Sequence, residues 1–135
     1  MQMILFRGKR IDNGEWIEGY LICDREHYGK PDHHSYIVNH HHPSGCFGRD
    51  VYIEVDPATV GQYTGLKDRN GVRIFEGDVV EFDKGQFVVE YFESRMGFGF
   101  SGLKGRGVVC GFTMTDWEHL KVIGNIHDDP ALLEV

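Results

Sequence analysis

The sequence predicts an all-β fold made of many short strands. Glycine occurs 18 times in 135 residues without a three-residue period, which indicates frequent turns. Short runs of β-branched and aromatic residues alternate with turn residues, among them the Asn-Gly pairs at 13–14 and 70–71. No segment carries the 3.6-residue apolar period of a long amphipathic helix. Together these observations favour a small barrel or sandwich.

The first expected element is an N-terminal hairpin. Residues 3–6 are its first strand, Asp12-Asn13-Gly14 is the turn, and residues 15–22 are the returning strand. Asn-Gly accepts positive φ at both central positions of a type I′ turn, whose twist matches that of the flanking strands.

Residues 24–50 differ in composition and are expected to form a long, arm-like loop. They contain six of the eight histidines and a single apolar pair, Ile37-Val38. Because so little apolar material cannot offset the entropy lost on ordering, we expect a partner subunit to order this arm. Residues 1–60 are thus predicted to hold the N-terminal hairpin and the histidine-rich arm.

Strand signals return at residues 51–55, and the residues after them carry local turn signals. Asp56 is the candidate N-cap of a short helical turn that has Pro57 at its first position. The pair at 70–71 predicts a tight turn, which Asp68 can close with an Asx-type hydrogen bond. Gly77-Asp78 predicts another turn before the next strand.

Residues 81–92 predict a second hairpin with its turn at 83–85. Phe87, Val89 and Tyr91 should share one face of its returning strand. Residues 61–135 are therefore expected to form a barrel-like region, for which the SH3-like barrel is an analogy.

Residues 97–111 contain six glycines and are expected to be a flexible connection, with Phe98 and Phe100 packing at a contact surface. The letters at 97–102 fit G-x-G-x-x-G, but two more glycines follow where a dinucleotide site needs a helix to begin. We therefore reject a dinucleotide site. Strands are expected near 108–114 and at 120–126, and Asp129-Pro130 predicts a short C-terminal helix.

The charge balance bears on partners. The chain has 14 Lys and Arg residues against 21 Asp and Glu residues, a net charge of −7. Because phosphate binding needs a basic surface, nucleic acid is disfavoured as a partner. The three cysteines lack a C-x-x-C spacing, and no apolar run reaches the length of a signal or membrane segment. A cytoplasmic protein without membrane contact is expected.

The histidine-rich arm holds the candidate metal ligands His33, His40, His42 and Cys46. Imidazole and thiolate bind zinc and other transition metals, and structural zinc takes about four such ligands. Residues 40 and 42 would share one face of an extended chain, so they could bind a common ion. Adventitious binding by a histidine-rich loop is the alternative. No other cofactor is expected.

Two further features have a simpler interpretation than catalysis. Glu76 and Asp78 lie two residues apart and could act as an acid–base pair, but no nucleophile or second base accompanies them. A turn-stabilising Asp78 and a solvated Glu76 are the preferred interpretation. Cys110 lies in an apolar run and is interpreted as a core residue.

Three passages give the chain a resemblance to a known family. They are residues 6–20, with Gly14-Glu15-Trp16; residues 60–78, with Gln62-Tyr63-Thr64-Gly65-Leu66 and Ile74-Phe75-Glu76-Gly77-Asp78; and residues 122–130. In these passages the chain resembles the YopX family of phage and prophage proteins. The resemblance implies one all-β domain over residues 1–135 and assembly into a homo-oligomer, and it implies no catalytic residues.

The preferred interpretation is a phage or prophage accessory protein, and a binding role is preferred over an enzymatic one. The protein would associate with itself or bind a phage or host protein. One alternative is a metal-binding module or metal-dependent enzyme that uses residues 33–46. The other is single-stranded nucleic-acid binding by a small barrel, with Phe98 and Phe100 as stacking platforms.

Overall fold

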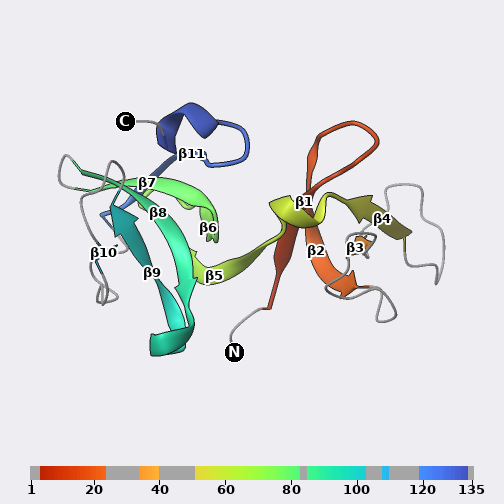
Figure 1. The fold of residues 1–135 in the computed structure, drawn as a ribbon, viewed down its shortest axis with the longest axis horizontal. Coiled ribbons are helices and arrows are strands. Elements are labelled where there is room, and N and C mark those ends of the chain that lie inside the picture. The colour runs from red at the N-terminus through yellow and green to blue at the C-terminus, as the bar shows by residue number, and fades with distance from the viewer. Residues whose placement is uncertain are drawn as a thin grey trace. The chain divides into compact units, whose positions relative to one another are not determined.

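A computed structural model describes residues 4–23, 34–39, 51–82, 85–102, 108–109 and 119–133. The chain divides into two compact units, residues 1–62 and residues 63–135 (Figure 1). Antiparallel strands and short 3-10 turns make up the regular structure of the described residues, which confirms the all-β prediction. The predicted barrel is wrong, because the sheets are not closed into a barrel: in the first, the end of β4 (Val51–Val55) meets the end of β1 (Phe6–Lys9) only at an isolated bridge between Val55 and Arg10.

The first unit is an antiparallel sheet in the order β4-β3-β2-β1. Its elements are β1 (Phe6–Lys9), β2 (Trp16–Cys23), β3 (Ser35–Asn39), β4 (Val51–Val55) and the 3-10 turn η1 (Pro57–Thr59). The start of β5 (Gly61–Lys67) pairs with β1, with Phe6 opposite Gln62.

The predicted N-terminal hairpin is present, although its first strand lies further along the chain than expected. β1 begins at Phe6, whereas the sequence placed that strand at residues 3–6. The turn lies where it was predicted, and Gly14 has a φ of 73°. The predicted type I′ geometry is wrong, because Asn13 lacks the positive φ that this turn type requires. The Asn13 side-chain oxygen instead accepts the Glu15 N–H at 2.9 Å. The turn residues therefore predicted the position of the bend, whereas pairing with the neighbouring strands determines where β1 begins.

β3 lies inside the segment predicted to be a loop, so that prediction is wrong for residues 35–39. Ile37 and Val38 are 0% and 4% exposed, and Ser35 is 2% exposed. β2 and β4 flank β3 on both sides and supply the packing that the arm lacks on its own. The remaining arm residues, 24–33 and 40–50, lie outside the described residues.

Two glycines let this sheet curl tightly. A Cβ atom on Gly8 would lie 2.9 Å from the Val55 side chain, and one on Gly19 would lie 2.3 Å from the Val38 carbonyl oxygen. The curl brings the end of β4 to β1, where the Asp56 N–H donates to the Lys9 carbonyl at 2.8 Å. As predicted, the Asp56 side chain caps η1 by accepting the Ala58 N–H at 3.0 Å.

In the second unit, the rest of β5 pairs with β6, and five further strands form a sheet in the order β10-β9-β8-β7-β11. The elements are β6 (Arg73–Phe75), β7 (Asp78–Phe82), β8 (Gly85–Phe92), η2 (Glu93–Arg95), β9 (Gly97–Gly102), β10 (Val108–Val109), β11 (Lys121–Asn125) and η4 (Pro130–Leu133). The predicted hairpin, the strand near 120–126 and the short C-terminal helical turn are all present.

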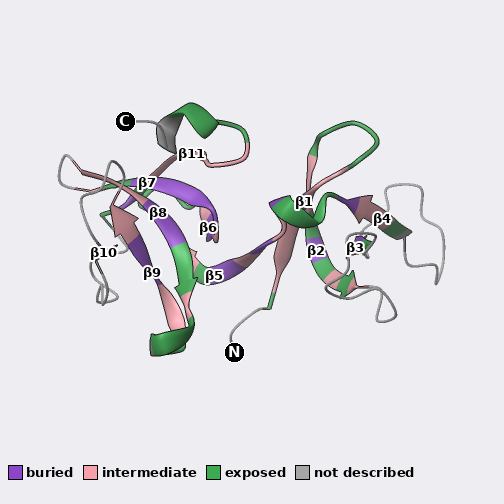
Figure 2. Cartoon of the chain, viewed as in Figure 1, coloured by how far each residue is buried: buried purple, intermediate pink, exposed green. Residues whose placement is uncertain are grey.

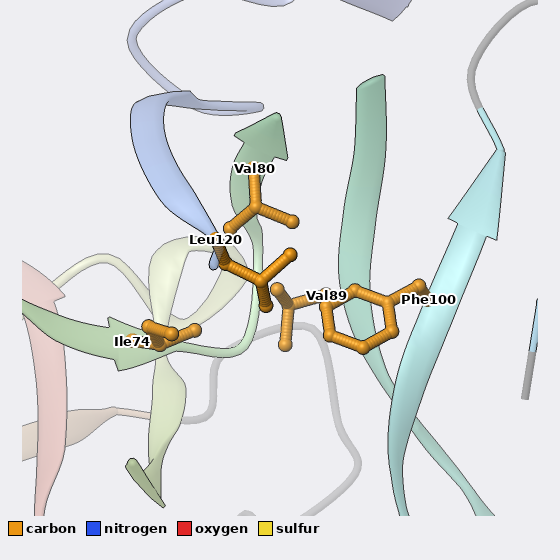
Figure 3. Packing of buried hydrophobic residues seen from close by; sticks show 5 residues of the cluster. All are labelled: Ile74, Val80, Val89, Phe100 and Leu120. Carbon is orange, nitrogen blue, oxygen red and sulfur yellow. The ribbon is translucent and has the colours of Figure 1, made fainter. Parts of the chain in front are cut away.

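The core of this unit consists of two apolar clusters. The larger one contains fully buried side chains from β6, β7, β8, β9 and the residue before β11: Ile74, Val80, Val89, Phe100 and Leu120 (Figure 3). The smaller one is formed by Val79 and Val88. Neighbouring residues of β7 and of β8 thus enter different clusters, so each strand packs on both of its faces at these residues. Figure 2 shows β7 and part of β8 in the colour of buried residues.

The glycine-rich segment is a strand in its first half, so its prediction as a flexible connection is wrong for residues 97–102. β9 pairs with β8 over six positions, from Phe87 opposite Gly102 to Phe92 opposite Gly97. Phe100 is 0% exposed and lies at an edge-to-face angle to Phe87, with ring centroids 6.4 Å apart. Phe100 is therefore a core residue and does not lie at a contact surface.

Candidate binding surface

In the first unit, no layer formed by the described residues covers one face of the sheet. Side chains alternate between the faces of a strand, and the inner face carries Gly8, Gly19, Ile37 and Val55, all buried. We call the opposite side the tyrosine face. It comprises Trp16, Tyr20, Ile22, Tyr36, Val38 and Tyr52.

Strand register aligns the centre of this face. Tyr20 of β2 lies opposite Val38 of β3, which lies opposite Tyr52 of β4. The two tyrosines are 54% and 59% exposed, while Val38 between them is 4% exposed. The next row pairs Ile22, which is 42% exposed, with Tyr36 and Glu54. Large exposed apolar groups grouped in this way mark an interaction surface more often than isolated ones do.

The β1 side of the face is basic. The Arg7 guanidinium carbon lies 4.6 Å from the centroid of the Trp16 ring, and the Lys9 ammonium lies 5.7 Å from it. Both contacts fall within the range of cation–π attraction. Trp16 is therefore held in place by its neighbours on β1.

The β4 side of the face is acidic. Glu54 follows Tyr52 by two residues on the same face, and its carboxylate lies 3.2 Å from His34 Nδ1. The His34 ring is stacked against Tyr36 with centroids 6.5 Å apart. Glu18 is a second carboxylate on the same face, but it lies on β2 directly opposite Arg7, near the β1 side. Two basic and two acidic side chains make the face close to neutral.

A shallow depression adjoins Tyr52. It has a volume of about 410 Å³ and is lined by Arg10, Ile11, Asp12, Tyr52, Ile53 and Glu54. The Arg10 guanidinium donates two hydrogen bonds to the Asp12 carboxylate, at 2.9 and 2.7 Å. These bonds are the main cause of a lowered pKa at Asp12 and a raised pKa at Arg10. Both charges are therefore already neutralised at this rim.

The buried carboxylates of the second unit hold backbone amides. Asp68 accepts N–H groups from Asn70, Val72 and Val122 at 2.8, 2.9 and 3.0 Å. Asp78 is 1% exposed and accepts the Phe75 N–H at 2.8 Å. The preferred interpretation of Asp78 as a turn-stabilising residue is confirmed, and Asp68 closes the predicted Asx turn.

The predicted metal ligands His33, His40, His42 and Cys46 lie outside the described residues, as does Cys110. Within the described ranges, no three His, Cys, Asp or Glu side chains converge as metal ligands would. The two proposed stacking platforms differ in their surroundings. Phe98 is half-buried with its ring edge-on to Tyr91, at a centroid distance of 5.3 Å, whereas Phe100 is buried in the core.

The tyrosine face was not among the sites predicted from the sequence. One signal was available, because Trp16, Tyr20 and Ile22 recur at even spacing in a predicted strand. The other members come from the supposed arm and from β4, so only the strand register brings them together.

Comparisons with known proteins address the fold and the family. Residues 5–134 match the family model described as YopX protein. The crystal structure of protein EF1440 from Enterococcus faecalis resembles this chain with a TM-score of 0.56 and 23% identity, over 99% of this chain and 100% of that one. That likeness concerns the fold alone. No curated protein is significantly similar in sequence. In the described part of the chain, no helix has the length and apolarity needed to cross a bilayer.

Proposed function

We propose that this chain, which belongs to the YopX family, is a phage or prophage accessory protein that acts by binding protein through its tyrosine face. The partner is another copy of the chain or a different protein, in the cytoplasm of a bacterial host. The observation that carries the proposal is the group formed by Tyr20, Ile22 and Tyr52, which are 54%, 42% and 59% exposed on one sheet face.

Residue chemistry supports a protein partner. Tyrosine and tryptophan bring large, rigid contact area with a polar group at one end, and they are enriched in protein interfaces. Binding of single-stranded nucleic acid also uses exposed aromatic rings, but it needs a positively charged groove alongside them. On this face Glu18 and Glu54 offset Arg7 and Lys9, and the whole chain carries a net charge of −7. The charge balance therefore favours protein.

The proposal also assigns the buried carboxylates to the framework. Asp68 and Asp78 accept backbone N–H groups, and the N–H groups that Asp68 accepts help to lower its pKa. A residue engaged in this way is a poor general base. We therefore assign these two carboxylates to the framework and give them no catalytic role.

Site-specific photocrosslinking tests the proposal. A Tyr52→p-benzoylphenylalanine variant is produced in the bacterial host and irradiated, with a matched Val72→p-benzoylphenylalanine variant as control. Val72 is 48% exposed and lies in the second unit. We expect adducts at position 52 that proteases remove and nucleases do not, in clear excess over position 72. Nuclease-sensitive adducts, or equal yields at the two positions, would refute a protein-binding role for this face.

A further inference from the structure

The spacing of the two exposed tyrosines restricts what can lie across them. Tyr20 and Tyr52 are separated by one intervening strand, β3. Since neighbouring strands lie about 4.8 Å apart, the two backbone positions are about 9.6 Å apart. The two residues lie in one row across the strands, with the apolar Val38 between them.

A polyproline II helix has a matching period. It has three residues per turn and rises about 3.1 Å per residue, so every third side chain returns to the same side about 9.3 Å further along. Prolines three residues apart would therefore meet Tyr20 and Tyr52 in turn. A β-strand ligand, whose side chains repeat on one face about every 6.8 Å, does not match the row.

The chemistry of the rings also suits such a ligand. The carbonyl groups of a polyproline II segment have no internal hydrogen bonds, and tyrosine hydroxyls can donate to them. The ligand is already extended before binding and loses little entropy, and aromatic-lined surfaces recognise it in known domains. Both tyrosines are more than half exposed, so their rings are accessible.

The charge of Glu54 indicates which type of residue should stand beside the prolines of the ligand. Glu54 shares the face with Tyr52 and lies two residues further along β4, about 6.8 Å away. A basic residue next to the proline pair would reach this carboxylate, as His34 does from within the chain at 3.2 Å.

We propose that the tyrosine face binds an extended proline-rich segment of a partner protein, with prolines three residues apart and a basic residue beside them. This inference rests on the proposed function and names its partner. Tyr20 and Tyr52 hold the two prolines, and Glu54 holds the basic residue.

Isothermal titration of the full chain with defined peptides tests this inference. The probe is a ten-residue peptide with proline at every third position, alanine between and arginine at one end. The matched control peptide has glycine in place of proline. We expect the proline peptide to bind at least about tenfold more tightly. Equal binding of the two peptides would overturn the inference.

Variants then test the assigned residues. Tyr20→Ala and Tyr52→Ala should each weaken binding at least about tenfold, as loss of an aromatic anchor does. Tyr91→Ala is the matched control, because Tyr91 is 45% exposed in the other unit, and it should leave binding unchanged. Glu54→Gln should remove the preference for arginine over alanine at the flank. Tyr52→Phe is a control for misfolding, because it keeps the aromatic ring and should lose only part of the affinity.

The outcomes separate this inference from the proposed function. Protein adducts at position 52 together with equal binding of both peptides would refute the proline-rich partner and leave the protein-binding role intact. Adducts that join two copies of the chain would identify a second copy as the occupant, again against the proline-rich partner. Tighter binding of an oligothymidine than of the proline peptide, with nuclease-sensitive adducts, would refute both.

Discussion

Asp68 offers the sharpest test of how the second unit is held together. Its side chain is 6% exposed, and one carboxylate oxygen accepts the N–H groups of Asn70 and Val72. The other oxygen accepts the Val122 N–H at 3.0 Å, from a strand 54 residues away in sequence. The carboxylate therefore fixes a local turn and joins that turn to β11.

The Asp68→Asn substitution keeps the size of the side chain and changes one acceptor into a donor. At least one backbone N–H then loses its partner in a buried setting, which costs about 1–3 kcal/mol of unfolding free energy. Asp68→Ala removes all three acceptor contacts and should cost more than Asp68→Asn. Of the three amides, Val122 should be affected most by Asn, because no other part of the turn can replace that contact.

Urea unfolding followed by circular dichroism measures the difference in free energy. Asp12→Asn is the matched control, because Asp12 is exposed and its partner Arg10 remains in water when the pair is broken. The control should change stability little. If Asp68→Asn and Asp12→Asn have the same effect, the argument that Asp68 joins the turn to β11 fails.

The same residue predicts a pH dependence. Burial, the largest single influence, raises the Asp68 pKa, but the N–H groups of Val122, Val72 and Asn70 and the charge of Arg69 outweigh it, so the pKa is lowered. The carboxylate then stabilises the fold above its unfolded pKa of about 4, and this contribution is lost as the pH falls through the folded value. Wild-type stability should decline in acid more steeply than that of Asp68→Asn. Parallel declines would contradict this account.

Three further substitutions test the packing. Gly19→Ala should lower unfolding free energy by about 1–3 kcal/mol, because its Cβ would lie 2.3 Å from the Val38 carbonyl oxygen, and the loss should appear as a lower urea midpoint. Thr59→Val removes a hydroxyl that accepts the Lys9 N–H at 2.9 Å and donates to the Asp56 carbonyl at 2.6 Å. The substitution should lower the unfolding free energy by about 1–3 kcal/mol and speed amide hydrogen exchange at Lys9. Phe100→Ala should cost about 3–5 kcal/mol, since that side chain is 0% exposed, whereas the half-buried Phe98→Ala should cost less in the same thermal melt.

Local turn chemistry accounts for the elements that could be predicted from the sequence. The hairpin turn at Asn13-Gly14, the cap at Asp56 and the Asx turn at Asp68 each depend on residues within four positions of one another. The side chain alone fixes such bends, because Gly supplies positive φ and Asp or Asn accepts a nearby N–H. The Asp68 turn has a distant partner in addition, since its carboxylate also accepts the Val122 N–H.

The failures share a physical cause, which is that strand pairing is decided by a distant partner. Four of the six residues 97–102 are the small residues glycine and serine, yet β8 supplies bulky side chains opposite three of them. Phe92 lies opposite Gly97, Val88 opposite Ser101 and Phe87 opposite Gly102. β3 likewise depends on β2 and β4 for the burial of Ile37. A prediction based on the composition of one segment cannot account for the packing that a neighbouring strand contributes.

The passages that carry the family resemblance differ in what they do. Residues 60–78 and 122–130 include Asp68, Asp78 and Val122, whose contacts build the core and turns of the second unit. Residues 6–20 instead place Trp16 and Tyr20 on the exposed side of the first sheet. A shared framework thus explains two of the three passages, while the first also bears on binding.

This division has a consequence for partner choice. Tyr36 and Tyr52 complete the tyrosine face from outside all three passages, so the family resemblance does not specify them. Trp16 and Tyr20 would then supply contact area in every protein that shares the passage at residues 6–20. Tyr36 and Tyr52 would decide which spacing of ligand side chains the face accepts. Exchanging Tyr52 for the corresponding residue of another YopX protein should therefore alter peptide preference without altering the urea midpoint, since Tyr52 is 59% exposed. A change in stability without a change in preference would assign Tyr52 to the framework instead.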